Sequence, residues 1–291
     1  MKIVRHETPH RDSIKFIDTV FSDHIDLQSD IKRTLTSHLN KGTFSLHQNS
    51  DFRIVASAFQ SIWHPTCIYM QVAYNFTRSN KLELHEMLTY LQTRFEQPLM
   101  FKIDDRFEQL CSILTESNYH RIRQTNICSI DVRTIHMKEM SLPNNILTLQ
   151  EVRRLPFLNN QFILLCKDVY TNTHLDNPVA DFPLTVWTNM IMTGVLDEIS
   201  SVLVVDGVVR AFSLMYEGDN QESWELGWNG VASEEALSIL KNLLDHQIQI
   251  GQRLGIHTIE KENDSTDPFS QYVMKDIPHT LTNTIYSYKG W

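Results

Sequence analysis

The sequence predicts a mixed α/β (α+β) fold in which two similarly built domains follow one another, each a mixed β-sheet flanked by helices. Three observations lead to this expectation. The stretch 222–254 reads as a strand that runs directly into a helix. The element order β-α-α-β-β-β-α-β-α-β is read in the second half and, with one central strand fewer, in the first. A polar stretch at 134–145 separates the two halves. We therefore expect domains at 1–133 and 146–291, with 134–145 as the linker.

The composition of the chain argues against several classes of partner and site before any motif is considered. The chain has 291 residues, 42% of them hydrophobic, and a net charge of −9, with no basic stripe, so nucleic acid is an unfavourable partner. No apolar run reaches the length of a membrane span, and the N-terminus lacks the apolar core of a secretory signal. Four cysteines without a CxxC pair and histidines without paired-ligand spacing predict no metal and indicate a reducing, cytoplasmic setting.

In the first half, apolar spacing of 3.6 marks helices, and runs of β-branched and aromatic residues mark strands. Only two central strands are clear there, and Gly42 reads as the residue that ends the second helix. The expected elements are a strand at 2–4, two helices between 13 and 41, strands at 52–59 and 67–76, a helix at 82–95, a strand at 99–103, a helix at 106–117 and a strand at 125–132.

The second half repeats this order with clearer signals. Asp206-Gly207 between two apolar runs predicts a hairpin, and Pro156 fits the first turn of a helix. The expected elements are a strand at 146–149, helices at 156–170 and 184–192, strands at 200–205, 208–217 and 222–231, a helix up to 254, a strand at 257–261, a helix at 267–275 and a strand at 280–288.

The joint between strand 222–231 and its helix is the first candidate binding feature. Ser233 reads as the N-cap, with Glu234 and Glu235 in the first turn and apolar residues at helical spacing behind them. Free N–H groups at a helix start can bind an anion. Eight of the nine glycines lie from Gly194 onward, so chemistry that needs close backbone approach is expected in the second half.

Three features of the second half resemble the GNAT superfamily of N-acetyltransferases. The run 208–216 followed by 224–231 is similar to the paired central strands of that family. Asn263 falls where the family has an asparagine after its fifth strand. Tyr272 keeps the family's spacing to a Gly-Phe pair, although Asp276-Ile277 stands in its place. The resemblance covers nearly the whole chain in element order.

The resemblance implies transfer of an acetyl group from acetyl-CoA to an amine of a small molecule or peptide. Such a reaction requires a deprotonated amine, aligned reactants and a proton for the leaving thiolate. By resemblance, Tyr272 would be the acid and Glu225 the base, and Asp176 and Asp181 would lie where the acceptor binds. The residues expected to bind the coenzyme are Gly230, Val231, Ala232, Ser233 and Asn263.

Departures from the family keep a second function open. The segment from Ala232 to Glu235 has none of the arginine, glutamine or glycine of the family's pyrophosphate loop, and its two glutamates would repel a phosphate. A catalytically silent GNAT-like protein that binds a ligand or a protein partner is therefore the alternative. The first half departs further, with Leu114 at the position of the tyrosine, and reads as a degenerate, scaffolding domain.

Overall fold

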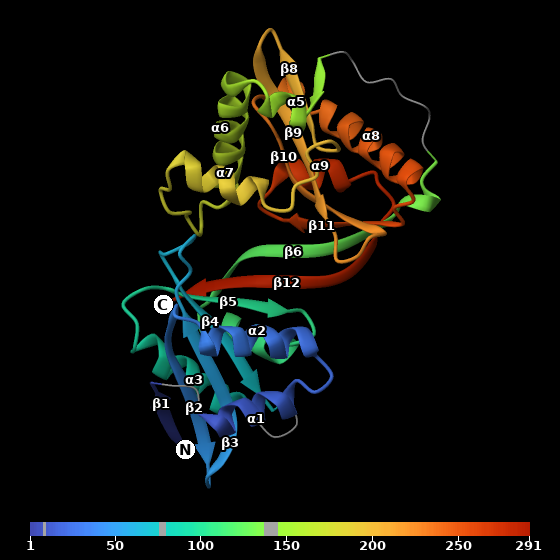
Figure 1. Ribbon diagram of the computed structural model, residues 1–291. Helices are drawn as coiled ribbons and strands as arrows, with labels where there is room; N and C mark the ends of the chain where they lie inside the picture. The colour runs from blue at the N-terminus through green and yellow to red at the C-terminus, as the bar shows by residue number, and fades with distance from the viewer. Residues whose placement is uncertain (8–9, 76–79, 137–144) are drawn as a thin grey trace. The chain divides into compact units, whose positions relative to one another are not determined.

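The computed structural model describes residues 1–7, 10–75, 80–136 and 145–291, which form two compact units. Unit 1 contains Met1–Arg123, Asp176–Ala180 and Ile285–Trp291; unit 2 contains Gln124–Leu175 and Asp181–Thr284. Each unit is a mixed β-sheet with helices on its faces (Figure 1), which confirms the expected fold class. Most of the expected linker, at 137–144, lies outside the described residues.

The sheet of unit 1 has the strand order β1-β2-β3-β4-β5-β12, in which only β4 and β5 are parallel. Most of its buried hydrophobic side chains form one large cluster, and Cys67, Tyr69 and Met100 form a second, smaller one. The elements are β1 (Lys2–His6), α1 (Arg11–Val20), α2 (Ile25–Thr36), β2 (Asn40–Gln48), β3 (Asp51–Phe59), β4 (Ile68–Tyr74), α3 (Lys81–Gln92), β5 (Leu99–Asp104), α4 (Glu108–Glu116) and the first residues of β6 (His120–Asp131).

Strand β2 is absent from the sequence-based expectation, and the assignment of Gly42 to a helix end was wrong. Gly42 lies inside β2 with φ 147°, at an irregularity in the pairing with β3, where its N–H donates to the Asn40 side chain at 2.8 Å. Glycine adopts this backbone conformation without the cost that other residues incur. Polar residues at both ends of β2 hide the period-2 pattern that would have marked the strand.

The sheet of unit 2 has the order β6-β11-β10-β9-β8-β7, with β10 and β11 parallel and the other pairs antiparallel. The hairpin across Asp206 and Gly207 is confirmed, with φ 51° and 74°. The elements are η1 (Val132–Thr134), β7 (Ile146–Thr148), α5 (Leu149–Arg153), α6 (Pro156–Thr173), α7 (Leu184–Met192), β8 (Ser201–Val205), β9 (Val208–Glu217), β10 (Ser223–Val231), η2 (Glu234–Ala236), α8 (Ile239–Leu254), β11 (Thr258–Asp264), α9 (Pro268–Met274) and β12 (Thr280–Gly290).

Helices cover opposite faces of the unit 2 sheet. In Figure 1, α6 and α7 lie on one side of β8–β10, and α8 lies on the other. Gly230 of β10 lies so close to Val169 of α6 that an added Cβ would come within 2.6 Å of its side chain. On the α8 side, Leu240, Leu244 and Ile248 pack in the same buried cluster as Trp224. The helical spacing seen in the sequence therefore does mark the buried face of α8.

The two closing strands are exchanged between the halves of the chain. β6, the last strand of the first half, pairs with β11 over Thr125–Asp131, and β12, the last strand of the chain, pairs with β5. Cys128, Ile130 and Val132 accordingly belong to the hydrophobic core of unit 2. Residues 124–133, which the sequence assigns to the first domain, thus lie in the second compact unit.

No helix in the described ranges combines the length and apolar character needed to cross a bilayer.

The strand exchange predicts how fragments of the chain behave. A fragment 146–291 lacks β6, so it loses three buried core side chains and exposes the edge of β11. We expect it to unfold without a cooperative transition or to aggregate, whereas a fragment 120–291 retains a cooperative transition. Chemical denaturation followed by circular dichroism measures the difference. Equal midpoints for the two fragments would show that β6 does not stabilise unit 2.

Candidate functional site

The candidate site begins where β10 leaves β11. The two parallel strands pair only over Ser223–Glu225 and Thr258–Glu260. Directly afterwards, the pairing of β10 with β9 becomes irregular between Leu226 and Asn229, which places an extra residue in β10. A bulge bends its strand, so β10 turns away from β11 at this point.

Gly227 lies within the bulge. An added Cβ there would lie 2.2 Å from the ring of Tyr216 on β9, a distance at which the ring or the strand must move. The Tyr216 hydroxyl is fixed on the opposite side by donating to the Ile191 carbonyl at 3.0 Å. Burial raises the pKa of this phenol, so it stays protonated. A glycine is therefore required for the bend to form against a fixed aromatic ring.

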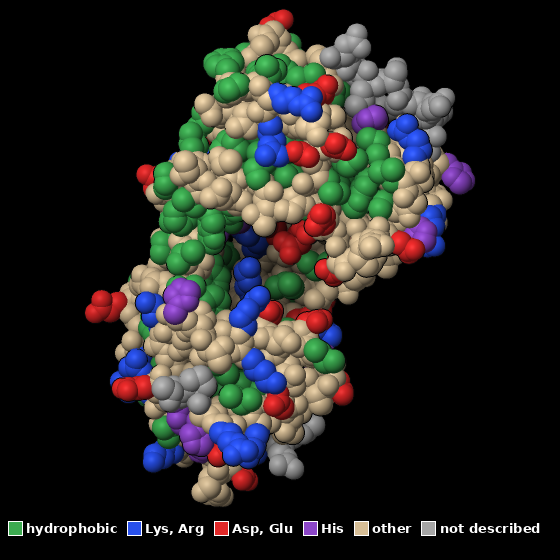
Figure 2. All heavy atoms as spheres, viewed as in Figure 1, with side chains coloured by type: hydrophobic (Ala, Val, Ile, Leu, Met, Phe, Trp, Pro, Cys, Tyr) green, Lys and Arg blue, Asp and Glu red, His purple; other side chains and the backbone are tan. Residues whose placement is uncertain are grey.

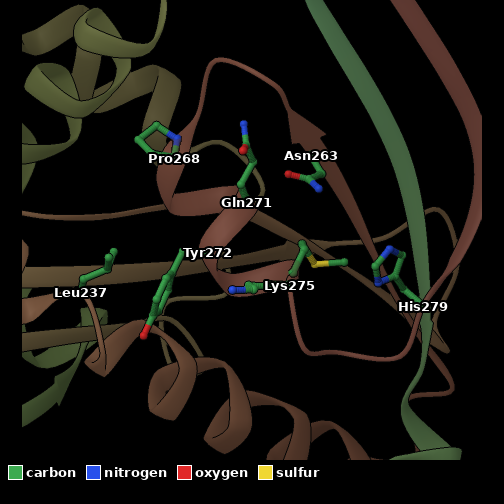
Figure 3. Close-up of a pocket in the computed structure, with 8 residues that line it drawn as sticks. Leu237, Asn263, Pro268, Gln271, Tyr272, Lys275 and His279 are labelled. Atoms are coloured by element: carbon green, nitrogen blue, oxygen red, sulfur yellow. The ribbon is translucent and has the colours of Figure 1, made fainter.

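A pocket of about 560 Å³ opens beyond the point of separation. Leu237, which follows β10, and Asn263, near the end of β11, both line it. Figure 3 shows Leu237 and Tyr272 on one side and Asn263 and His279 on the other. The remaining lining residues come from α9 and its end: Pro268, Gln271, Met274 and Lys275. The structure thus brings together two of the residues singled out in the sequence, Asn263 and Tyr272.

Tyr272 is a half-buried residue of α9 whose ring lies against α8. The Lys241 ammonium is 4.8 Å from the ring centroid, and the same lysine forms an ion pair with Asp276. In Figure 3 the hydroxyl end of the ring points away from Asn263. A group that receives a proton from Tyr272 must therefore lie on the Leu237 side of the pocket.

Asn263 connects the end of β11 to α9. Its side-chain oxygen lies 3.2 Å from the Ser270 hydroxyl, which is also 3.3 Å from the Glu262 carbonyl. Ser270 is fully buried in the first turn of α9, so these contacts hold the helix against the strand. The Asn263 carboxamide consequently has a fixed orientation at the pocket wall.

The segment after β10 differs from the expected helix start. Ser233 precedes a short 3₁₀ turn, η2, and α8 begins only at Ile239, so residues 232–238 form a longer connection than the sequence suggested. Gly230 and Val231 are buried, and the Ala232 N–H donates to the Arg210 carbonyl at 2.8 Å. That N–H is therefore engaged within the sheet and is not available to a phosphate.

The two glutamates of this connection remain exposed. A hydrogen bond from Ser233 lowers the pKa of Glu235, so its carboxylate is charged at neutral pH. Lys275 lines the wall of the pocket, as does His279, and the Lys241 ammonium lies over the ring of Tyr272.

Glu225 lies on the other face of the sheet from α8. Its register partner on β11 is Glu260, and both alternate with the core residues Trp224 and Ile259. Restricted hydration and then the charge of Glu262 raise the pKa of Glu225. Figure 2 shows acidic side chains gathered on the surface where β11 runs in Figure 1. A carboxylate with a raised pKa is a stronger base than an ordinary glutamate.

The two loop aspartates are not part of the pocket. Asp176 belongs to unit 1, where its carbonyl accepts a hydrogen bond from Lys289 at 2.6 Å. Asp181 is exposed and lies 3.3 Å from Lys167. Neither carboxylate lines the cavity around Tyr272. Their expected part in acceptor binding therefore gains no support from their positions and stays a prediction.

Sequence reasoning missed Lys261. This residue of β11 is 4% exposed, and its ammonium donates to the Gly227 carbonyl at 2.7 Å. Burial lowers the pKa of the lysine. The strand alternates, with Ile259 and Lys261 inward and Glu260 and Glu262 outward, so a lysine at an apolar position was the available signal.

In the first half, the strand–helix joint at 76–79 lies outside the described residues, and Leu114 is fully buried. Across the described ranges, no three histidine, cysteine or acidic side chains are grouped to hold a metal ion.

Comparison with known proteins identifies the fold. No family model and no curated protein matches the sequence. A GCN5-related N-acetyltransferase from Sphaerobacter thermophilus aligns with a TM-score of 0.60 at 11% identity, over 99% of this chain and 95% of that one. A tandem GNAT protein from the clavulanic acid biosynthesis pathway aligns at 0.55 and 9%, over 99% and 98%. An acetyltransferase of the GNAT family from Colwellia psychrerythraea aligns at 0.51 and 12%, over the whole of both chains. The chain therefore has the tandem GNAT fold expected from the sequence.

The close approach at Gly227 makes a testable prediction. Gly227→Ala should lower the free energy of unfolding by about 1–3 kcal/mol, because the new methyl group overlaps the Tyr216 ring. Thermal or urea unfolding measures the change. The matched background is Tyr216→Ala, in which the same substitution should cost much less because the ring is gone. An equal cost in both backgrounds would contradict the proposed clash.

Proposed function

We propose that this protein is an N-acetyltransferase that transfers an acetyl group from acetyl-CoA to an amine of a small molecule or peptide. The observation that carries the proposal is the pocket that opens where β10 separates from β11, lined by Asn263 and Tyr272. The tandem GNAT fold supports it, because the solved structures that share this fold include N-acetyltransferases.

In this proposal the coenzyme arm extends between β10 and β11 beyond Glu225. The strands no longer pair there, so their backbone groups can bond to an extended chain that contains amides, much as an added strand would. Asn263, held by Ser270, offers a fixed carboxamide to the same chain. The phosphates lie towards Lys275 and His279, away from the glutamates of η2.

The reaction needs a base for the amine and an acid for the thiolate. Glu225 is the proposed base, because restricted hydration raises its pKa and its exposed face is open to an acceptor. Glu260 and Glu262 add negative charge on the same face, which favours a cationic amine. Tyr272 is the proposed acid, and the sulfur then lies on the Leu237 side of the pocket.

One observation favours the alternative of a catalytically silent GNAT-like protein that binds a ligand or partner. The Ala232 N–H is already bonded to Arg210, and Glu234 and Glu235 stand where the family contacts pyrophosphate. The two functions differ in whether acetyl-CoA binds, so binding is measured before turnover.

Acetyl-CoA should raise the midpoint of thermal unfolding. A ligand at about 100 times its Kd stabilises the folded state by about 2.7 kcal/mol.

Lys275→Ala should weaken the binding of acetyl-CoA by roughly fivefold in Kd, since an exposed ion pair contributes up to about 1 kcal/mol. Lys41→Ala, an exposed lysine of unit 1, is the matched control and should bind like the wild type. Absence of any shift in the wild type would favour the silent alternative.

Tyr272→Phe should lower kcat on the order of 10²-fold, since it removes the proposed proton donor. Release of the free CoA thiol in the presence of a panel of primary amines measures the rate. The Kd for acetyl-CoA and the thermal midpoint should stay near wild type, because the donated proton is needed only as the thiolate leaves. An unchanged kcat with an intact fold would exclude Tyr272 as the acid.

A further inference from the structure

Lys261 is the most unusual buried group in unit 2. It extends from the middle of β11 on the face that also carries Ile259, and it pairs across the ladder with Cys128 of β6. Its side chain is 4% exposed, and among the residues that the structure describes the one acceptor of its ammonium is the Gly227 carbonyl, 2.7 Å away. Within the described parts of the chain it forms no ion pair.

This burial is energetically unfavourable. An ammonium group has three N–H donors, and one bond to a carbonyl leaves two of them without a protein acceptor. An unpaired buried charge is strongly destabilising unless something else satisfies it. The charges of Asp267, Glu262, Asp264 and Glu225 act on it from a distance and only partly offset the cost. A methionine of similar length would fit the same space without this penalty.

The location of the ammonium points to a use for the two remaining donors. Gly227 is the bulge residue at which β10 leaves β11, so the Nζ atom lies between the strands just where they separate. Asn263 lies two residues further along β11 on the same face, and it lines the pocket. Lys261 does not itself line the pocket; it lies behind Asn263, towards the paired part of the two strands, where a chain inserted between β10 and β11 would meet its ammonium.

We propose that Lys261 is a second catalytic residue that donates a hydrogen bond to the acyl carbonyl oxygen of the thioester. This inference rests on the proposed acetyltransferase function. The amine nitrogen forms a bond to the acyl carbon, the carbon–sulfur bond breaks, and the amine loses one proton while the thiolate gains one. Negative charge develops on the carbonyl oxygen during the attack, and the buried ammonium stabilises it without changing its own bonds.

This role is separate from that of Tyr272. The tyrosine delivers a proton to sulfur, whereas Lys261 keeps its protons and acts on oxygen. The bond to Gly227 fixes the ammonium before the reaction, so little reorganisation is needed when charge appears. If the lysine had a purely structural role and only held the bulge against β11, its removal would lower the stability of the fold. It would not change the preference of the protein for acetyl-CoA over CoA.

Lys261→Met tests the proposal with two readouts. The first is the thermal shift produced by acetyl-CoA compared with that produced by CoA, which lacks the acyl carbonyl. The wild type should prefer acetyl-CoA, and the variant should lose that preference while it still binds CoA. The second is thiol release with the most active amine of the panel, for which kcat should fall on the order of 10²-fold with little change in KM for acetyl-CoA.

Two further variants control for the fold and for the charge. Lys41→Met, on the surface of unit 1, should behave as the wild type in both readouts. Lys261→Arg keeps the charge and donors and should recover part of the lost rate. Should Lys261→Met fail to fold, Lys261→Gln, which is uncharged and shorter, replaces it in the comparison of acetyl-CoA with CoA.

The failures of the two proposals are distinguishable. A wild-type protein that neither binds acetyl-CoA or CoA nor releases thiol would overturn the acetyltransferase function and this inference together. An active wild type with an equally active, equally acyl-selective Lys261→Met variant would overturn the inference alone. Acetylation of Lys261 itself, detected by mass spectrometry after incubation with acetyl-CoA, would also overturn it, because the lysine would then be a nucleophile.

Discussion

The structure of unit 2 depends on the separation of β10 from β11. Parallel strands that pair over three residues and then diverge leave unpaired backbone groups facing a cavity, and this arrangement needs a local cause. The cause is the bulge at Gly227, which bends β10 and brings its carbonyl within reach of Lys261. The contacts of Ser270 with Glu262 and Asn263 then hold α9 against the separated end of β11, where the pocket lies.

The exchange of β6 and β12 fixes the position of β11, from which β10 separates. β11 is held on its far side by β6 over seven consecutive residue pairs, from Thr258–Asp131 to Asp264–Thr125. Because β6 comes from the first half of the sequence, the strand that carries Lys261 and Asn263 is stabilised by a segment remote along the chain. The first half therefore contributes directly to the framework of the candidate site.

Charge is distributed unevenly around the candidate site. Glu225, Glu260 and Glu262 occupy one face at β10 and β11, whereas Lys275, His279 and Lys241 lie around the pocket on the α9 side. The proposed function uses this contrast, since an acidic face attracts a cationic acceptor and Lys275 can attract the phosphates of the proposed donor. The acidic 3₁₀ turn η2 is the reason that the proposal places those phosphates towards α9.

The sequence by itself determined the element order of the second half, the hairpin at Asp206-Gly207 and the buried face of α8, because these depend on local periodicity and turn chemistry. Asn263 and Tyr272 were singled out by resemblance to a family, and the structure brings both to one pocket. It failed at β2, whose polar ends hide the strand pattern, and at the start of α8, where a 3₁₀ turn intervenes. Only the tertiary structure decided the exchange of β6 and β12, since strand pairing joins residues far apart in the chain and leaves no local signature. It also decided the burial of Lys261 against Gly227, because a lysine is buried only when distant elements close around it.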